Sequence, residues 1–153
     1  MALVWEKSTG SIHYAVRSAG AALRLYTNGA FHSQYNPNYL FTGAVWDLLT
    51  LPSLYIDTDL KNVLLLGVGG GAAIHQINQL HQPTKLYGVE LDKTHILIAR
   101  SIFGVNYPNT QLIHAEASAW LTESSTALKF DYIIDDIFAH GELEPERPFE
   151  PDN

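Results

Sequence analysis

Between Lys61 and Asp136, short apolar runs typical of strands alternate with segments whose apolar residues have a helical spacing. The expected strands are NVLLLG, KLYGVE, TQLIHA and FDYIIDD, and the expected helices are AAIHQINQL, KTHILIARSIFG and ASAWLTES. Such alternation is typical of a parallel sheet whose strands are joined by right-handed crossovers through helices. It predicts an α/β, Rossmann-like domain with a largely parallel sheet and flanking helices.

The first 37 residues have a different pattern, in which apolar and polar residues alternate. SIHYAVRS alternates in this way, and LRLYTNGAFHSQY places Asn28-Gly29 between two further strand-like runs. Asn-Gly in this position is the strongest short signal for a β-hairpin, because both residues accept the positive φ of a type I′ turn. Residues 1–37 are therefore predicted to form a small antiparallel β element.

The segment between these two parts, PNYLFTGAVWDLLTLP, predicts one helix. Phe41, Val45 and Leu48 have the spacing of one helical face. Asn38 can cap the first turn and Pro52 would end the helix.

Composition limits the possible functions. The chain has 153 residues, 46% of them hydrophobic, which is enough for one domain with a core. A formal charge of -7 argues against a nucleic-acid partner, and the absence of cysteine excludes disulfide and thiol chemistry. No apolar run approaches the ~18 residues of a membrane span, and the histidines lack the spacing of metal ligands. We expect a cytoplasmic protein with a small-molecule substrate, no nucleic-acid or membrane partner and no metal.

A glycine-rich turn follows the first predicted parallel strand, in LLLGVGGGAAIHQI. Gly67, Gly69, Gly70 and Gly71 stand between a strand and a helix, where missing side chains let backbone N–H groups approach a ligand. The next strand ends at Glu90, 19 positions after Gly71, where a carboxylate can accept hydrogen bonds from both ribose hydroxyls. Together these features predict a nucleoside site. The structural alternatives are a tight turn and an exposed strand-end charge.

Acidic residues also follow the later strands. Glu116 can accept a hydrogen bond from the amine of an adenine, or it can interact with the N-terminus of the next helix. The last strand ends on Asp135 and Asp136, which are expected to face a wet cleft, because burying an unpaired carboxylate is costly. Adjacent strand residues point to opposite faces. One of the two is therefore expected to serve the reaction, and Asp136, which lies nearer the loop, is the candidate catalytic base or amine anchor, whereas Asp135 either contacts the cofactor or caps a neighbouring helix or loop.

The glycines alone leave two ligand classes open. Gly67, Gly69 and Ala72 also match G-x-G-x-x-A, a pattern of dinucleotide sites. An NAD-binding domain is therefore an alternative to an adenosyl-binding one.

The succession VLLLGVGGG, LYGVELD, HAEASAWL and FDYIIDDIF, preceded by a β element, resembles the S-adenosylmethionine-dependent methyltransferase fold of class I and, within it, the spermidine synthase-like family. The resemblance implies that S-adenosylmethionine, or its decarboxylated form, is the cofactor. Gly67, Gly69 and Gly71 would pass under the methionine portion, Glu90 would hold the ribose and Glu116 would face the adenine. Asp136 would lie beside the reacting group, so an amine is one expected substrate.

Two departures from this resemblance bear on the reaction. Aminopropyltransferases of the family carry an aspartate inside the glycine turn, whereas this chain reads GVGGGAA. They follow the strand-end acid with Ser-Ser-Asp-Pro, whereas this chain reads IFAH. We therefore expect a methyltransferase, with a spermidine synthase as one alternative and a non-catalytic nucleoside-binding or interaction module as another.

The family's sheet continues with further strands beyond those predicted here, so the C-terminal strands of the fold are expected to be missing. We favour a fragment of a longer protein over a homodimer whose second copy covers the exposed edge of the last strand. Residues 38–140 are expected to form the nucleoside-binding domain, and residues 141–153, acidic and proline-rich, a flexible tail.

Overall fold

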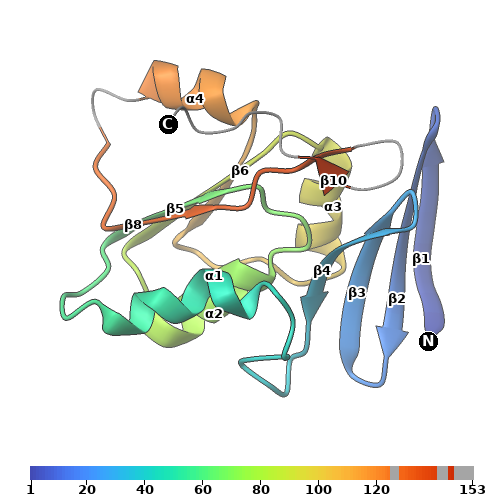
Figure 1. The fold of residues 1–153 in the computed structure, drawn as a ribbon, viewed down its shortest axis with the longest axis horizontal. Helices are drawn as coiled ribbons and strands as arrows, with labels where there is room; N and C mark the ends of the chain where they lie inside the picture. The colour runs from blue at the N-terminus through green and yellow to red at the C-terminus, as the bar shows by residue number, and fades with distance from the viewer. Residues whose placement is uncertain (125–127, 141–144, 147–153) are drawn as a thin grey trace.

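The structure is a computed structural model that describes residues 1–124, 128–140 and 145–146. It contains a four-stranded antiparallel sheet, a four-stranded parallel sheet with helices on both faces, and a short two-stranded ribbon (Figure 1). The predicted fold class is confirmed.

The N-terminal part is larger than a single hairpin. Its strands follow one another in the order of the sequence: β1 (Ala2–Thr9), β2 (Ile12–Ala19), β3 (Ala22–Thr27) and β4 (Ala30–Tyr35). The predicted Asn-Gly turn joins β3 to β4, with φ of 49° at Asn28 and 83° at Gly29. One face of the sheet buries Tyr14, Val16 and Leu25, which pack with Ile98 and Phe103 of the α/β part.

The segment after β4 differs from the predicted helix. The chain is irregular up to Trp46, and α1 covers only Asp47–Thr50 before a 3₁₀ helix, η1 (Leu51–Tyr55). Pro52 lies in the first turn of η1 instead of ending a helix. The predicted helix capped by Asn38 and ended by Pro52 is therefore wrong.

A buried carboxylate and a glycine explain why the chain before Asp47 is not helical. Gly43 has φ +75°, which interrupts a right-handed helix. The N–H groups of Thr42 and Gly43 donate to Oδ2 of Asp47 at 2.9 and 2.7 Å. Gln76 donates to the other oxygen, so the Asp47 carboxylate holds the loop in place of helical hydrogen bonds.

From Asn62 onward the predicted alternation of strands and helices is observed. The elements are β5 (Asn62–Leu66), α2 (Ala72–His81), β6 (Lys85–Glu90), α3 (Lys93–Ser101), β7 (Thr110–His114), α4 (Ala117–Ser124) and β8 (Tyr132–Asp135). The strand order is β7-β6-β5-β8, and each neighbouring pair is parallel. The direction of winding reverses between β5 and β8, which is where ligands bind in open α/β sheets.

The parallel sheet is buried on both faces. One cluster joins Val63, Leu65 and Ile134 of the strands to Ile74 and Ile77 of α2. A second cluster on the opposite face joins the strands to α4 through these residues: Leu64, Leu66, Val89, Ala117 and Trp120. Strands covered on both faces read as continuous apolar runs, which explains why NVLLL predicted its strand well.

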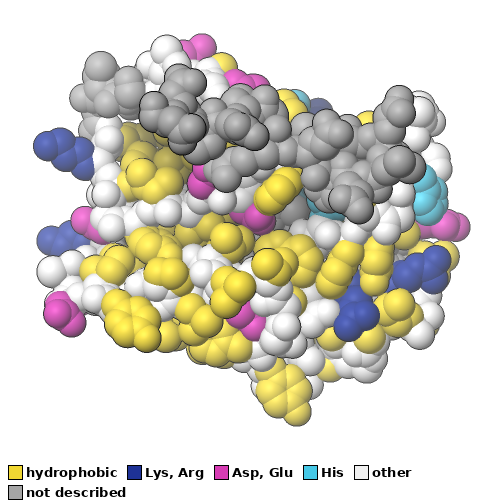
Figure 2. All heavy atoms as spheres, in the orientation of Figure 1, with side chains coloured by type: hydrophobic (Ala, Val, Ile, Leu, Met, Phe, Trp, Pro, Cys, Tyr) yellow, Lys and Arg dark blue, Asp and Glu magenta, His cyan; other side chains and the backbone are white. Residues whose placement is uncertain are grey.

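Hydrophobic side chains also lie on the surface. Figure 2 shows them gathered over the part of the molecule that carries α1 in Figure 1. Between β4 and β5, the exposed hydrophobic side chains are Tyr39, Phe41, Val45, Leu48, Leu54 and Tyr55.

After β8, the chain forms the short ribbon of β9 (Ala139–His140) and β10 (Pro145–Glu146). Pro145–Glu146 belongs to the segment for which a flexible tail is predicted, and 141–144 and 147–153 lie outside the described residues. In the described part of the chain, no helix has the length and apolar character needed to span a membrane.

Candidate functional site

A cavity of about 840 Å³ lies at the carboxyl ends of the parallel strands. Its walls come from both large sheets and from the segment around α1. The predicted site residues that line it are Gly67, Gly69, Glu90, Glu116, Asp135 and Asp136. Gly70 and Gly71 do not line it. The structure thus brings most of the predicted residues to one place, at the point where the strand order reverses.

The four glycines of the turn have different surroundings. A Cβ on Gly67 would overlap the carbonyl oxygen of Asp136, so this glycine lets β5 and β8 approach each other. A Cβ on Gly69 would lie 3.2 Å from the carbonyl oxygen of His32. A Cβ on Gly70 would lie 2.7 Å from the ring of Phe103, and Gly71 is the left-handed residue that precedes α2. Packing therefore accounts for Gly70 and Gly71, and their contact with a ligand stays a prediction.

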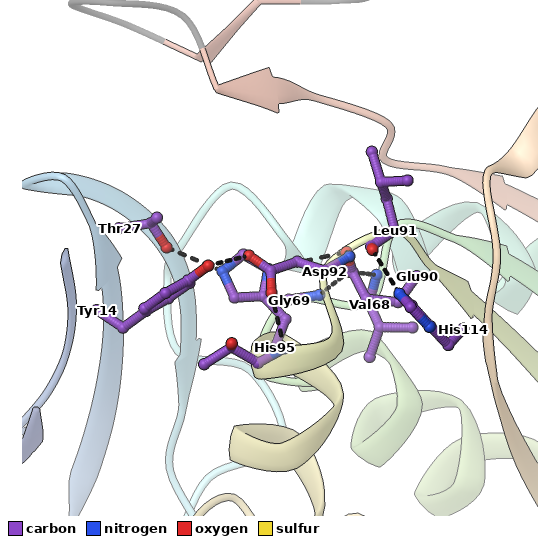
Figure 3. Close-up of polar contacts among 10 residues, drawn as sticks. Tyr14, Thr27, Val68, Gly69, Glu90, Leu91, Asp92, His95 and His114 are labelled. Atoms are coloured by element: carbon purple, nitrogen blue, oxygen red, sulfur yellow. Dashed lines mark hydrogen bonds and ion pairs between the residues drawn. The ribbon is translucent and has the colours of Figure 1, made fainter. Parts of the chain in front are cut away.

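Glu90 is buried at the end of β6 and faces the glycine turn (Figure 3). Its Oε2 accepts the N–H groups of Val68 and Gly69 at 2.8 and 3.0 Å. Its Oε1 accepts the N–H of Asp92 at 2.8 Å. Since a carboxylate offers about four acceptor positions, Glu90 keeps capacity for a further donor from the cavity.

Two contacts from the N-terminal sheet reach the same region, as Figure 3 shows. Thr27 of β3 lies 2.8 Å from Nε2 of His95, whose Nδ1 is 3.9 Å from Oε1 of Glu90. The hydroxyl of Tyr14 on β2 donates to Asp92 at 2.6 Å. Burial and this hydrogen bond raise the pKa of Tyr14 to about 12, so the hydroxyl keeps its proton.

These contacts were not predicted from the sequence. Tyr14 and Asp92 are 78 positions apart, and Thr27 and His95 are 68 apart. The alternation in β2 indicates that Tyr14 is buried, but no local pattern indicates its partner.

Glu116 follows β7 and lines the cavity from an exposed position. Its carboxylate accepts the N–H groups of Ser118 and Ala119 at 2.9 and 2.8 Å, and these bonds lower its pKa. The structure thus places Glu116 at the start of α4, the alternative interpretation of this residue. Its contact with an adenine stays a prediction.

Asp135 is the last residue of β8, Asp136 follows it, and both line the cavity. Asp135 is exposed, and its Oδ1 accepts the N–H of Ile137 at 3.3 Å. Asp136 is largely buried. Burial, reinforced by the charges of Glu90 and Asp135, raises its pKa to about 7, and a hydrogen bond from Trp46 acts in the opposite direction. A carboxyl with this pKa can take up or release a proton near neutral pH.

Aromatic side chains form the wall beside Asp136. The Trp46 and Phe31 rings meet edge to face with centroids 4.9 Å apart, and both line the cavity. Trp46 is positioned by the irregular segment before α1, and Phe31 by β4. The wrong helix prediction is the reason that Trp46 was missed as a site residue.

Among residues 1–124, 128–140 and 145–146, no group of three or more His, Asp or Glu side chains is arranged to hold a metal ion.

Neither a family model nor a curated protein sequence matches the chain. Its fold is similar to that of a spermidine synthase in complex with the transition-state analogue AdoDATO, with a TM-score of 0.69 and 15% identity over 89% of this chain and 46% of that chain. A probable spermidine synthase from Corynebacterium glutamicum gives a TM-score of 0.72 and 17% identity over 92% of this chain and 53% of that chain. Human methyltransferase-like protein 13 in complex with SAH gives a TM-score of 0.51 and 19% identity. The match covers 65% of this chain and 48% of that chain.

The chain thus spans about half the length of each of these structures. At 15–19% identity the likeness concerns the fold. The chain has the S-adenosylmethionine-dependent methyltransferase fold in the form found in spermidine synthases.

Proposed function

We propose that the protein is a transferase that binds S-adenosylmethionine and transfers the methyl group to an amine. The observation that carries this proposal is the joint placement of Glu90 and Asp136 in one cavity at the switch point of the sheet. Glu90 offers a carboxylate at a strand end, as ribose binding requires, and Asp136 offers a proton acceptor with a pKa of about 7.

The residues of the cavity fit an adenosyl sulfonium. Leu91, which is 63% exposed, and Ala115 and Ala117 offer apolar surface near Glu90 for a base. Among the described residues that line the cavity, Lys93 is the only lysine or arginine. The carboxylates that line the cavity are Glu90, Asp92, Glu116, Asp135 and Asp136. A cavity of this charge favours a cationic ligand and disfavours the pyrophosphate of a dinucleotide.

Glu90 would hold the ribose of the bound cofactor, whose sulfonium would supply the methyl carbon and keep on sulfur the electron pair of the bond that breaks as the amine nitrogen bonds to that carbon. The task of Asp136 is to hold the amine and to accept the proton that leaves its nitrogen. The two sheets line the cavity and would fix the approach of the amine, which is the larger part of the catalysis expected for such a transfer. Methyl transfer is preferred to aminopropyl transfer because the glycine turn contains no acid.

Calorimetric titration tests the binding part of the proposal. S-Adenosylmethionine and S-adenosylhomocysteine should bind, and NAD should bind much more weakly. Glu90→Gln should weaken binding by about 5- to 150-fold, the loss expected for hydrogen bonds to a charged group. Glu123→Gln on α4 is the matched control, because it removes an exposed carboxylate that does not line the cavity.

Because Glu90 also orders the glycine turn, a second experiment changes the ligand instead of the protein. A 2′,3′-dideoxy form of S-adenosylhomocysteine should bind to the unaltered protein about as weakly as the parent compound binds to Glu90→Gln. Equal affinity for the two compounds would remove Glu90 from the ribose site. Tighter binding of NAD than of both adenosyl compounds would overturn the proposed cofactor.

A further inference from the structure

The cavity has two chemically different ends. Glu90 ends β6 and Glu116 follows β7, whereas Asp135 ends β8, on the other side of β5, and Asp136 comes next. Neighbouring strands lie about 4.8 Å apart, so the ends of β7 and β8, which are three spacings apart, are separated by about 14 Å. The end beside β8 is the one available to an acceptor if the nucleoside lies across β5, β6 and β7.

The acceptor end is mostly apolar. Trp46, Phe31 and Val45 line the cavity there, and the edge-to-face contact of the two rings fixes them as one wall. The other apolar lining residues from α1 and from the chain after β8 are Leu49, Ile137 and Phe138. Such a wall binds the hydrocarbon part of a ligand, and its ring faces also attract a cation.

The polar groups at this end are few among the described residues. Asp136 is the largely buried carboxylate, and Trp46 holds it by a hydrogen bond. Asp135 lines the cavity but is exposed, and an exposed carboxylate contributes little to an ion pair. One ammonium group can therefore be well paired here, at Asp136. A second one, carried on a short alkyl chain, would lie against apolar side chains without a strong partner.

From this arrangement we infer that the acceptor is an amine with a single ammonium group and an apolar, ring-bearing body, and not a linear di- or polyamine. The inference rests on the proposed function and narrows its substrate class. The ammonium group lies against Asp136, and the apolar body lies against the wall formed by Phe31, Val45 and Trp46.

Equilibrium binding of three probes tests the inference without any turnover. At pH 8, with S-adenosylhomocysteine present, 2-phenylethylamine should bind at least about tenfold more tightly than 1,4-diaminobutane. It should also bind about tenfold more tightly than 2-phenylethanol, which keeps the ring and lacks the charge. Tighter binding of the diamine, or equal binding of the amine and the alcohol, would overturn the inference.

A charge introduced into the wall gives the sharper test. Val45→Asp adds a carboxylate to the wall of the cavity and, because this position is exposed, should narrow the difference in affinity between 2-phenylethylamine and 1,4-diaminobutane by about two- to fivefold. Leu48→Asp is the matched control, because Val45 and Leu48 are both 64% exposed, lie in the same segment, and only Val45 lines the cavity. The control should keep the preference of the unaltered protein. A narrowing of the difference in both variants, or in neither, contradicts the assignment of the wall.

Failure of the inference can be told apart from failure of the proposed function. If S-adenosylhomocysteine binds and the diamine is preferred, the cofactor site stands and the acceptor class is wrong. If no adenosyl compound binds, the proposed function fails, and amine binding measured without the adenosyl compound then shows whether the wall binds amines by itself.

Discussion

The ionised Asp136 carboxylate is needed for the proposed activity but lowers the stability of the folded protein. Its pKa in the folded protein is about 7, against an ordinary value of 3.8. The folded state therefore holds a proton that the unfolded state has released, and stability falls as pH rises from 3.8 toward 7. A buried carboxylate of this kind destabilises the protein by about 2–4 kcal/mol at pH 8.

Asp136→Asn should therefore raise the free energy of unfolding at pH 8 by about 2–4 kcal/mol, and change it little at pH 4. Urea unfolding at the two pH values checks this. The exposed Asp57→Asn is the control and should show no such difference. An equal effect of Asp136→Asn at both pH values would mean that packing, and not titration, is responsible.

The same substitution separates binding from chemistry. Asp136→Asn should leave the affinity for S-adenosylhomocysteine within about threefold of the original, and lower methyl transfer to an amine by about 100-fold or more, because a positioned proton acceptor is lost. Affinity is measured by calorimetry and transfer with a labelled methyl group. Unchanged transfer would leave the protein as a binding module.

At the scale of elements, His75 joins three parts of the fold. On α2, it stacks on Tyr35 of β4 with ring centroids 3.8 Å apart, and it lies 2.8 Å from the hydroxyl of Tyr107 and 2.9 Å from the carbonyl oxygen of Phe103. The carbonyl requires a donor, so Nε2 carries the proton and Nδ1 accepts from Tyr107. Burial lowers the pKa of His75 to about 4, and the ring is neutral.

Because the folded pKa lies below the ordinary 6.5, the unfolded state takes up a proton first as pH falls. Stability is therefore lost between pH 6.5 and 4, opposite in sign to the effect of Asp136. His75→Gln should lower the free energy of unfolding at pH 7.5. At pH 5 this loss should be smaller by about 1–2 kcal/mol. Urea unfolding checks this, with the exposed His13→Gln as control. A cost independent of pH would exclude titration of His75 as a source of the acid sensitivity.

The elements also show what the sequence could predict. The buried strands and the glycine turn have local signals, so β5 to β8 and the place of Glu90 were predicted correctly. The segment before Asp47 lacks such a signal, because its conformation depends on a carboxylate that bonds to Thr42, Gly43 and Gln76. The helical spacing of its apolar residues reflects the wall of the cavity and the exposed surface instead. Contacts of this kind join residues that are distant in the sequence, and no local pattern in a single sequence predicts them.

At the scale of the whole molecule, the boundary proposed after residue 37 is bridged by a shared core. Tyr14 and Leu25 of the N-terminal sheet pack with Ile98 and Phe103, and Tyr14 also donates to Asp92. We expect the two sheets to unfold together in one transition. Differential scanning calorimetry should give equal calorimetric and van't Hoff enthalpies.

A saturating adenosyl ligand should raise the midpoint of that single transition by about 5–10 °C at a hundred times its dissociation constant. Tyr14→Phe tests the link between the sheets, because it removes only the hydroxyl that reaches Asp92. It should lower the midpoint without splitting the transition. Two separate transitions in the original protein would show that the sheets are independent units.

The hydrogen bonds of Glu90 also bear on how a product would leave the proposed site. In the free protein, the carboxylate accepts the N–H groups of Val68, Gly69 and Asp92, so it is already hydrogen-bonded when no ribose is present. A departing product would not leave a bare buried charge, because these donors remain within reach. Release would then cost little, and the cycle would not be slowed by a product held too tightly.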